Sequence, residues 1–353
     1  MLLLASTVIQ VSFALYTIPI FRSQRNSIES TSLDNLNGVL YSATVVVGNN
    51  QKLTVDLDTG SSDVWFRSTL CQSTDGSCSV EKQFDATDSS ITDLKTTFNI
   101  KYGDLSHTDC EIVQGTVTLA GYSAAIPFGL ATTMVGFNKS PDTDGILGLG
   151  FNDISAISSN LQGKSANWFD ALQLPSGENV FSFFLSLDQQ NTGELTIGGY
   201  DPNRIVGDIA FFPQYSPGLW DIDVTGMVFQ VGSTTGQAQY QVTSGLVDTG
   251  TTRLVLEEKV YHAIHAALGA TLEGETYVID CRNTEAIVFE IQGKLFTLPY
   301  NYYMKQINDK CYTDIETDTN NPSVIFGDTF LRMFYSIFDK ENKKIGFAVA
   351  KQS

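Results

Sequence analysis

The feature that most constrains the fold of this chain is an internal repeat. The tripeptide Asp-Thr-Gly, followed by two hydroxyl residues, begins at Asp58 in VDLDTGSSDVWF and again at Asp248 in GLVDTGTTRLVL, 190 residues later. Each copy is followed further on by two apolar residues and a glycine, at 146–148 and at 325–327. A repeat of this size indicates two similar lobes that face each other across a cleft, each bringing one aspartate to the shared boundary.

The remainder of the chain has the pattern of an all-β protein. With 353 residues, 42% of them hydrophobic, it can bury a large core and has the length of two domains rather than one. Two stretches predict helices, 256–270 and the shorter 165–173. Short runs rich in β-branched or aromatic residues and bounded by turn residues predict strands within 41–48, 52–58, 96–103, 115–121, 179–187, 193–199, 286–293 and 344–350.

The charge of the chain excludes one class of partner. Acidic residues outnumber basic ones 39 to 21, which gives a formal charge of −18 at pH 7. Such a chain repels nucleic acid and anionic membrane surfaces, so we expect neither as a partner. Protonation of carboxylates at low pH would relieve the self-repulsion, which is compatible with acidic surroundings.

The amino terminus is typical of a secretory signal. The stretch MLLLASTVIQVSFALYT is uncharged and apolar, short for a membrane span and long enough for a signal-peptide core, with a buried helix or strand as the alternative. No later segment is a spanning candidate, and the final KKIGFAVAKQS lacks the hydrophobic tail of a lipid-anchor signal. We expect a protein without a membrane anchor, located outside the cell or in an acidic vesicular compartment.

Cysteine usage agrees with an oxidising compartment. Of the five cysteines, Cys71 and Cys78 form one close pair in the sequence, and Cys281 and Cys311 can form a second. Disulfides are favoured over a metal site because no pair has Cys-x-x-Cys spacing and histidines are few. Cys110 is left over, either as a buried thiol or as an exposed one open to intermolecular pairing.

The paired aspartates suggest a specific chemistry. A carboxylate at the end of an apolar strand is costly unless its charge is stabilised or neutralised. Two carboxyl groups within hydrogen-bonding distance cannot both ionise, so they share a proton and titrate as a unit. One can then take a proton from a water while the other donates a proton to a substrate carbonyl. A single Asp-Thr-Gly is often an ordinary turn, but two copies a domain apart favour a catalytic pair of Asp58 and Asp248.

The residues after each aspartate suit a supporting role. The glycines allow main-chain N–H groups to approach the carboxylates, two threonines can lock the loops together, and the next hydroxyls can orient the outer carboxylate oxygens. The supporting residues expected on this reasoning are Thr59, Gly60, Ser61, Thr249, Gly250 and Thr251.

Taken together, these stretches resemble the pepsin-like aspartic endopeptidases from about residue 35 to 350. The two Asp-Thr-Gly stretches resemble the active-site loops of that family, and DGILGLGF at 144–151 and SVIFGDTFLRMFYSIFD at 323–339 resemble the segments after which its chain threads past each aspartate. The resemblance implies a bilobal pepsin-like acid protease fold and catalysis by Asp58 and Asp248. It also implies disulfides at both cysteine pairs, polypeptide substrates, pepstatin-type inhibitors, a monomer and no cofactor.

The resemblance extends to a flap. KYGDLS at 101–106 resembles the hairpin that closes over substrate in this family, which implies that Tyr102 and Gly103 contact the peptide and that Trp65 hydrogen-bonds Tyr102. Without the family, Tyr-Gly-Asp would be read as an ordinary turn. The chain departs from the pattern at Leu105, where the family usually has glycine, so we expect a bulkier tip that slows opening or narrows the cleft.

Two further acids are candidates for substrate recognition. Asp104 at the flap tip resembles its counterpart in fungal-type relatives, where an acid accepts a basic side chain just before the cleaved bond. Asp56 lies two residues before Asp58 in the same strand, so its side chain is expected on the same side. We expect Lys to be tolerated before the bond alongside large apolar residues; the alternative is that both acids are solvated and have no role.

The other motifs in the sequence do not point to a second kind of active site. His262 and His265 fall on one side of a predicted helix, but no Glu follows the first as metallopeptidase chemistry requires, so we expect no metal. No Gly-x-Ser-x-Gly elbow and no phosphate-cradling glycine loop occurs. Asn138 begins a glycosylation sequon that the following Pro141 weakens.

Four segments are expected along the chain. Residues 17–34 resemble the start of a family activation segment, much shortened, which would make the chain a zymogen. The expected segments are a signal peptide at 1–16, this activation segment at 17–34, an N-terminal lobe at 35–205 and a C-terminal lobe at 206–353.

A second function class remains open. A catalytically weak or inactive binding protein on the same fold would keep the cleft, but such relatives usually lose an aspartate or a loop glycine. Because both aspartates, both glycines and their hydroxyl partners are present, the sequence favours an enzyme.

Overall fold

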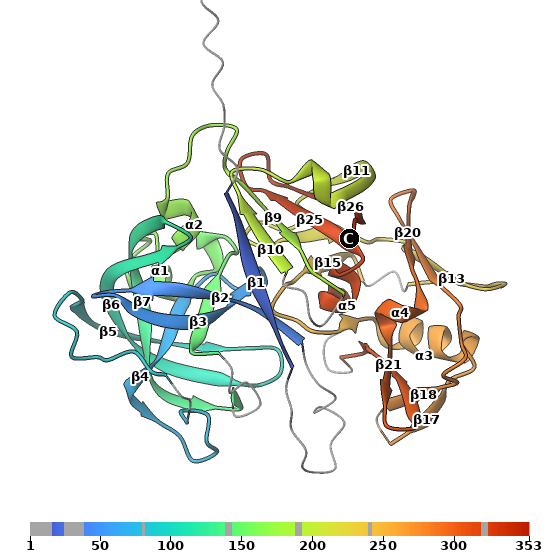
Figure 1. The fold of residues 1–353 in the computed structure, drawn as a ribbon, viewed down its shortest axis with the longest axis horizontal. Coiled ribbons are helices and arrows are strands. Elements are labelled where there is room, and N and C mark those ends of the chain that lie inside the picture. The colour runs from blue at the N-terminus through green and yellow to red at the C-terminus, as the bar shows by residue number, and fades with distance from the viewer. Residues whose placement is uncertain are drawn as a thin grey trace, which may run out of the picture.

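The computed structural model describes residues 16–24, 39–79, 82–137, 143–187, 193–238, 242–274, 276–318 and 324–352. Nearly all of the expected signal peptide, much of the expected activation segment and the sequon at Asn138 lie outside these residues. Figure 1 shows two β-rich lobes, one built from the first half of the chain and one from the second, with strands shared between them.

The N-terminal lobe is one continuous run of strands in the order β2-β3-β8-β4-β7-β6-β5. In β2 the side chains of Tyr41, Ala43, Val45 and Val47 are all fully buried, which is the period of two expected of a strand with one face on the core. The strands are β2 Val39–Val47, β3 Gln51–Asp58, β4 Val64–Gln72, β5 Thr92–Lys101, β6 His107–Leu119, β7 Tyr122–Val135 and β8 Gly145–Gly148.

A central sheet joins the two lobes and continues into β2, in the order β11-β26-β25-β9-β10-β1. The first strand pairs with β10 through residues 16–20 and with β2 through residues 21–24, so it bridges the central sheet and the N-terminal lobe. The lobe boundary expected after residue 205 falls at the start of β11. The strands are β1 Tyr16–Gln24, β9 Val180–Phe184, β10 Gly193–Ile197, β11 Ile205–Pro213, β25 Phe334–Asp339 and β26 Lys344–Ala350.

The C-terminal lobe consists of three smaller sheets. The first lies at the lobe boundary and contains β12 Asp221–Asp223, β15 Ser244–Val247, β16 Leu254–Val255, β23 Ile315–Glu316 and β24 Val324–Phe326. The second contains β13 Val228–Val231, β14 Thr234–Gln237, β19 Ile287–Ile291 and β20 Lys294–Leu298. The third contains β17 Thr271–Glu273, β18 Thr276–Ile279, β21 Met304–Ile307 and β22 Lys310–Thr313.

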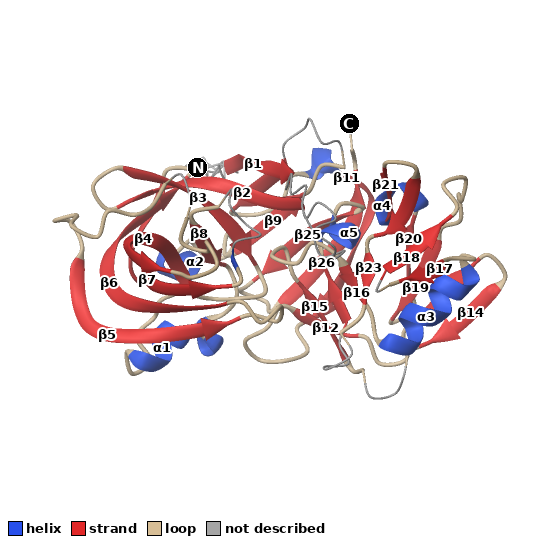
Figure 2. Ribbon diagram, turned by 90° about the horizontal axis from the view of Figure 1, so that it is seen from below, coloured by secondary structure: helices blue, strands red, loops and turns tan. Residues whose placement is uncertain are grey.

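Helices are few and short among the described residues (Figure 2). The longest, α3, spans Glu258–Ala267 inside the predicted 256–270, and Gly269 in a left-handed conformation follows its end. The second predicted helix is the single turn α2, Trp168–Ala171. The sequence did not predict the other short turns, because one turn is too short to show a helical period: α1 Ala156–Asn160, α4 Tyr300–Tyr303, α5 Asp328–Leu331 and the 3₁₀ turns η3 Asn152–Ile154 and η4 Pro202–Arg204.

The cysteines are arranged in two disulfides and one thiol. Cys71 is bonded to Cys78 and Cys281 to Cys311, with Cα atoms 5.7 and 5.2 Å apart. Of the two alternatives for Cys110, the structure has the buried thiol, and burial raises its pKa to about 12. Within the described parts of the chain, no helix has the length and apolar character needed to cross a membrane.

Candidate active site

The two aspartates stand at equivalent places in the two lobes. Asp58 is the last residue of β3, which runs parallel to β8, and Asp248 directly follows β15, which runs parallel to β24. The glycines of the downstream repeat, Gly148 and Gly327, press against the backbone of the aspartate loops. A Cβ on Gly148 would lie 2.5 Å from the carbonyl carbon of Ser62, so the second landmark of the repeat is needed for close packing behind the first.

The two carboxyl groups share main-chain donors. The N–H of Gly60 donates to Oδ1 of Asp58 at 2.8 Å and to Oδ1 of Asp248 at 3.1 Å. The N–H of Gly250 donates to Oδ1 of Asp248 at 2.8 Å. A Cβ on Gly60 would lie 2.6 Å from Oδ1, Oδ2 and Cγ of Asp248, and one on Gly250 would lie 2.5 Å from Oδ1 of Asp58. Each glycine therefore makes room for the aspartate of the opposite lobe.

The environment of Asp58 favours its protonated form. Its side chain is 5% exposed and that of Asp248 is 8% exposed. Burial raises the pKa of Asp58 well above its usual range, and the charge of Asp248, a hydrogen bond to Asp248 and the charge of Asp56 raise it further. A hydrogen bond from Ser61 acts in the opposite direction. The proximity of Asp248 therefore favours a proton on Asp58.

Two threonines fasten the loops to each other. The hydroxyl of Thr59 donates to the carbonyl of Val247 at 2.8 Å and accepts from the N–H of Thr249 at 3.0 Å. The hydroxyl of Thr249 donates to the carbonyl of Leu57 at 2.5 Å and accepts from the N–H of Thr59 at 3.1 Å. Both side chains are buried, so these four bonds are shielded from water and fix the distance between the two aspartate loops.

The outer oxygen of each carboxyl group accepts a hydrogen bond from a side-chain hydroxyl. The Ser61 hydroxyl donates to Oδ2 of Asp58 at 2.5 Å, and the Thr251 hydroxyl donates to Oδ2 of Asp248 at 2.6 Å. With Oδ1 of each aspartate bound to main-chain N–H groups, both carboxyl groups are held in one orientation. The arrangement can position a water and polarise a carbonyl placed between the two groups.

The hairpin between β5 and β6 brings Tyr102 near Asp58. The Trp65 indole donates to the Tyr102 hydroxyl at 2.7 Å, which is the hydrogen bond expected from the sequence. Phe137 packs edge-on against both rings. Burial and the nearby charge of Asp58 raise the pKa of Tyr102. The side chain of Tyr102 is therefore close to Asp58. Gly103 follows it, with open space around its Cα.

The remaining recognition candidates differ in setting. Asp104 is exposed at the flap tip, where its Oδ1 accepts from the N–H and the hydroxyl of Ser106 at 3.0 and 2.6 Å. Asp56 is 7% exposed, and its charge acts on Asp58. Leu105 has a φ of +69° and is 68% exposed.

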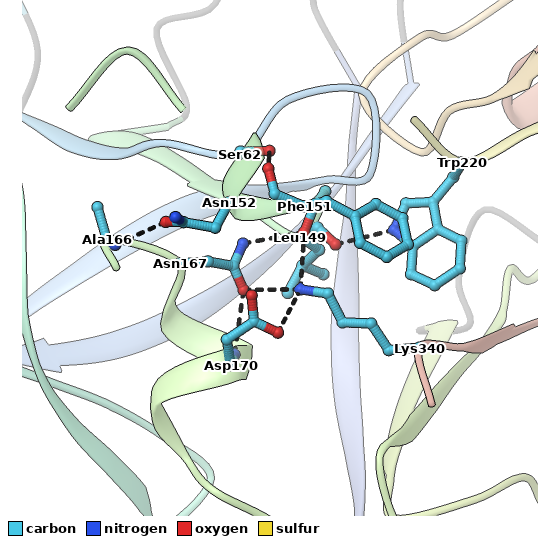
Figure 3. A network of polar contacts seen from close by, with 10 residues as sticks. Ser62, Leu149, Phe151, Asn152, Ala166, Asn167, Asp170, Trp220 and Lys340 are labelled. Carbon is cyan, nitrogen blue, oxygen red and sulfur yellow. Dashed lines mark hydrogen bonds and ion pairs between the residues drawn. The ribbon is translucent and has the colours of Figure 1, made fainter. Parts of the chain in front are cut away.

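A buried network that the sequence did not predict supports the Asp58 loop (Figure 3). The ammonium of Lys340, which follows β25, donates to the carbonyl of Gly150 at 2.8 Å and to Oδ1 of Asn167 at 3.0 Å, and it pairs with Asp170 at 2.7 Å. The N–H of Gly150 in turn donates to the carbonyl of Ser61 at 2.8 Å. A cation near the end of the chain is thus two hydrogen bonds from the first aspartate loop. The segment around Lys340, FDKENKK, has the sequence of a surface turn and gives no indication that this lysine is buried.

The histidines of α3 have other partners. His265 is buried, its Nδ1 donates to the carbonyl of Tyr261 at 2.7 Å, and its Nε2 lies 2.7 Å from the Thr313 hydroxyl. His262 lies on the exposed side, 2.8 Å from the Tyr277 hydroxyl. Among the residues that the structure describes, no group of three or more His, Cys, Asp or Glu side chains is arranged to hold a metal ion.

Comparison with known proteins identifies a family for nearly the whole chain. The family described as eukaryotic aspartyl protease matches residues 40–350. The chain is 32% identical over 328 residues to pepsin A of Gallus gallus, covering 90% of this chain and 86% of that protein. It is 32% identical over 338 residues to cathepsin E of Rattus norvegicus, covering 88% and 80%. It is 29% identical over 350 residues to pregnancy-associated glycoprotein 1 of Bos taurus, covering 95% and 88%.

Proposed function

The chain belongs to the eukaryotic aspartyl protease family, and we propose that this aspartic endopeptidase cleaves internal peptide bonds at acidic pH with a water molecule activated between Asp58 and Asp248. The observation that carries the proposal is the shared N–H of Gly60, which reaches Oδ1 of both aspartates. A solvated pair of acids would not need a glycine pressed against the opposite carboxyl group.

The reaction uses the shared proton. One carboxylate takes a proton from the water, whose oxygen attacks the peptide carbonyl, while the other carboxyl group donates its proton to the carbonyl oxygen. In the second step a proton returns to the leaving nitrogen as the carbon–nitrogen bond breaks. Because the mechanism needs one proton on the pair, activity is lost as the pH rises through the raised pKa that burial and Asp248 give Asp58.

Substrate preference follows from the flap and the nearby acids. The partly buried Tyr102 ring, held by the buried Trp65, offers an apolar surface beside Asp58, which suits large apolar side chains next to the bond. Both Ser106 contacts use Oδ1 of Asp104, so its Oδ2 can accept the ammonium of a Lys side chain, and the charge of Asp56 adds to the same field. We therefore propose tolerance of Lys before the cleaved bond.

The setting of the enzyme is part of the proposal. Polypeptides are its substrates, pepstatin-type compounds are its inhibitors, and it acts as a monomer. Two disulfides and the apolar amino terminus support a protein that is secreted or located in an acidic vesicle, with residues 17–34 as an activation segment.

The test compares the parent protein with Asp58→Asn and Asp248→Asn. Cleavage of acid-denatured haemoglobin is measured from pH 2 to 7, with and without pepstatin. We expect pepstatin-sensitive cleavage by the parent and a loss of about 10² to 10⁴-fold in each variant, because an amide can neither give nor take the shared proton.

Asp208→Asn provides the matched control, because it makes the same change at an exposed residue of β11. It should retain parental activity. If the parent shows no pepstatin-sensitive cleavage at any pH, the proposed activity is wrong and the binding-protein alternative stands. If either active-site variant keeps parental activity, the proposed roles of Asp58 and Asp248 are wrong.

A further inference from the structure

Leu105 at the flap tip combines two unfavourable properties. Its side chain is 68% exposed, and its backbone lies in the left-handed region with a φ of +69°. L-residues with a Cβ pay a steric penalty in this region, which glycine does not. A leucine in this position therefore gains little from burial and loses free energy through its backbone.

This combination is not found elsewhere in the described part of the chain. The other non-glycine residues there with positive φ are polar, charged or alanine, so none of them is a large apolar residue: Asn50, Lys95, Ala120, Gln162, Gln173, Gln292, Asn308 and Lys343. The other large exposed hydrophobic residues have no positive φ. Neither folding nor backbone geometry accounts for leucine at this site.

The tip is held by hydrogen bonds that do not use the leucine side chain. The N–H of Leu105 donates to the carbonyl of Tyr102 at 3.0 Å, and the N–H of Tyr102 donates to the carbonyl of Ser106 at 2.8 Å. Asp104 closes the turn through Ser106. A glycine or an asparagine at 105 could keep every one of these bonds.

The turn also fixes where the leucine lies. A four-residue turn closed by this bond brings the Cα atoms of Tyr102 and Leu105 within about 7 Å of each other. Tyr102 is close enough to Asp58 for the charge of Asp58 to raise the pKa of Tyr102. An exposed aliphatic side chain is thus carried on the hairpin that holds Tyr102 near Asp58.

We propose that Leu105 is a specificity-determining residue that contacts an apolar side chain of the bound peptide and becomes buried only in that complex. The inference rests on the proposed function, since it needs a peptide in the cleft. It explains why an unfavourable residue occupies the tip. In the free protein the leucine side chain stays exposed, whereas in the complex its burial against the substrate contributes to the free energy of binding.

The experiment measures selectivity with a set of peptides. Octapeptides with two central phenylalanines carry Leu or Gln at one of the six other positions and Ala at the rest, and kcat/KM is measured for each. In the parent we expect Leu to be preferred over Gln at one or two positions. That preference should fall about tenfold in Leu105→Gly and in Leu105→Asn, the loss of one apolar contact. Leu105→Met, which keeps an apolar side chain, should restore it.

Two controls separate contact from structure. Glycine and asparagine accept the left-handed backbone, so the thermal midpoints of Leu105→Gly and Leu105→Asn should not fall below that of the parent. Leu295→Asn removes an equally exposed leucine, 69% exposed on β20 of the other lobe, and should leave all six preferences unchanged.

Two results would overturn the inference, and they are distinguishable. If Leu105→Asn keeps the parental Leu-to-Gln preference at all six positions while cleaving normally, the contact does not exist and the proposed function survives. If the parent cleaves neither these peptides nor haemoglobin, the proposed function fails and the inference falls with it.

Discussion

Asp58 is surrounded by groups that shift its pKa in opposite directions. Burial, Asp248 and the charge of Asp56 all raise its pKa, whereas the hydrogen bond from Ser61 lowers it. Asp56 and Ser61 flank the aspartate on either side in the chain, and each can be changed without removing either member of the pair. Under the proposed mechanism, the pH range of activity depends on these individual neighbours as well as on the pair itself.

These opposing effects predict the direction in which the pH profile of kcat/KM moves when each neighbour is changed. In Asp56→Asn the loss of a nearby negative charge lowers the pKa of Asp58, so the high-pH limb of kcat/KM moves to lower pH. In Ser61→Ala the loss of a bond to the charged form raises that pKa, so the limb moves to higher pH. Cleavage of one peptide across pH measures both. Shifts in the same direction would contradict the assignment.

At the scale of elements, α3 carries a buried histidine into the C-terminal lobe. The His265 ring stacks on Tyr277 of β18 at 4.0 Å between centroids and meets Thr313 of β22 through Nε2. Burial lowers the pKa of His265 to about 4, and His262 one turn away adds to the effect. The neutral ring satisfies its partners, with one nitrogen donating to Tyr261 and the other accepting.

This histidine should weaken the C-terminal lobe in acid. Because its pKa is lower in the folded state than the usual 6.5, the unfolded chain binds more protons between pH 6.5 and about 4, so stability falls as the pH falls through that window. The full loss is about 3 kcal/mol. Chemical unfolding of the parent and of His265→Gln at pH 7 and pH 4 measures it.

The Gln variant should lose less stability than the parent between those two pH values, whatever its stability at pH 7. The comparison removes the contribution of the carboxylates, which are common to both proteins. An equal loss in both would show that His265 is not responsible.

At the scale of the whole molecule, Lys340 ties the end of the chain to the first active-site loop. Its ammonium lies over the rings of Phe151 and Phe169, at 5.1 and 5.8 Å from their centroids, and bonds to three oxygens of the N-terminal half. Trp220 adds a second tie from its indole to the carbonyl of Leu149 at 2.9 Å (Figure 3). The two halves are thus joined through buried contacts as well as through the central sheet.

Removing this cation should cost more than weakening its partner. Lys340→Met leaves the partly exposed Asp170 carboxylate without its cation and removes one of the two donors to the Gly150 carbonyl and to Oδ1 of Asn167, so we expect a loss of about 2 to 3 kcal/mol. Asp170→Asn keeps an oxygen acceptor at the rim of the site and should cost about 1 kcal/mol. Thermal or chemical unfolding of the three proteins ranks them. Equal stability of Lys340→Met and Asp170→Asn would contradict this role.

The sequence by itself determined the fold class and the family and singled out Asp58 and Asp248 as the candidate pair, because those depend on local patterns that recur. The β-branched run at 41–48 predicted the strand β2, and the repeated Asp-Thr-Gly pointed to equivalent places for Asp58 and Asp248, which lie at the ends of two strands. The same reasoning failed for one-turn helices such as α5, where the chain turns because its neighbours pack against it rather than because of any period.

Only the tertiary structure decided which distant groups meet. Nothing local in FDKENKK distinguishes the buried Lys340 from the surface lysines beside it, and nothing in the flap sequence shows that Leu105 is left-handed and exposed. The physical reason is that a periodic pattern reports the face of an element, whereas the burial of a charge or the strain of a turn depends on what the rest of the chain places next to it.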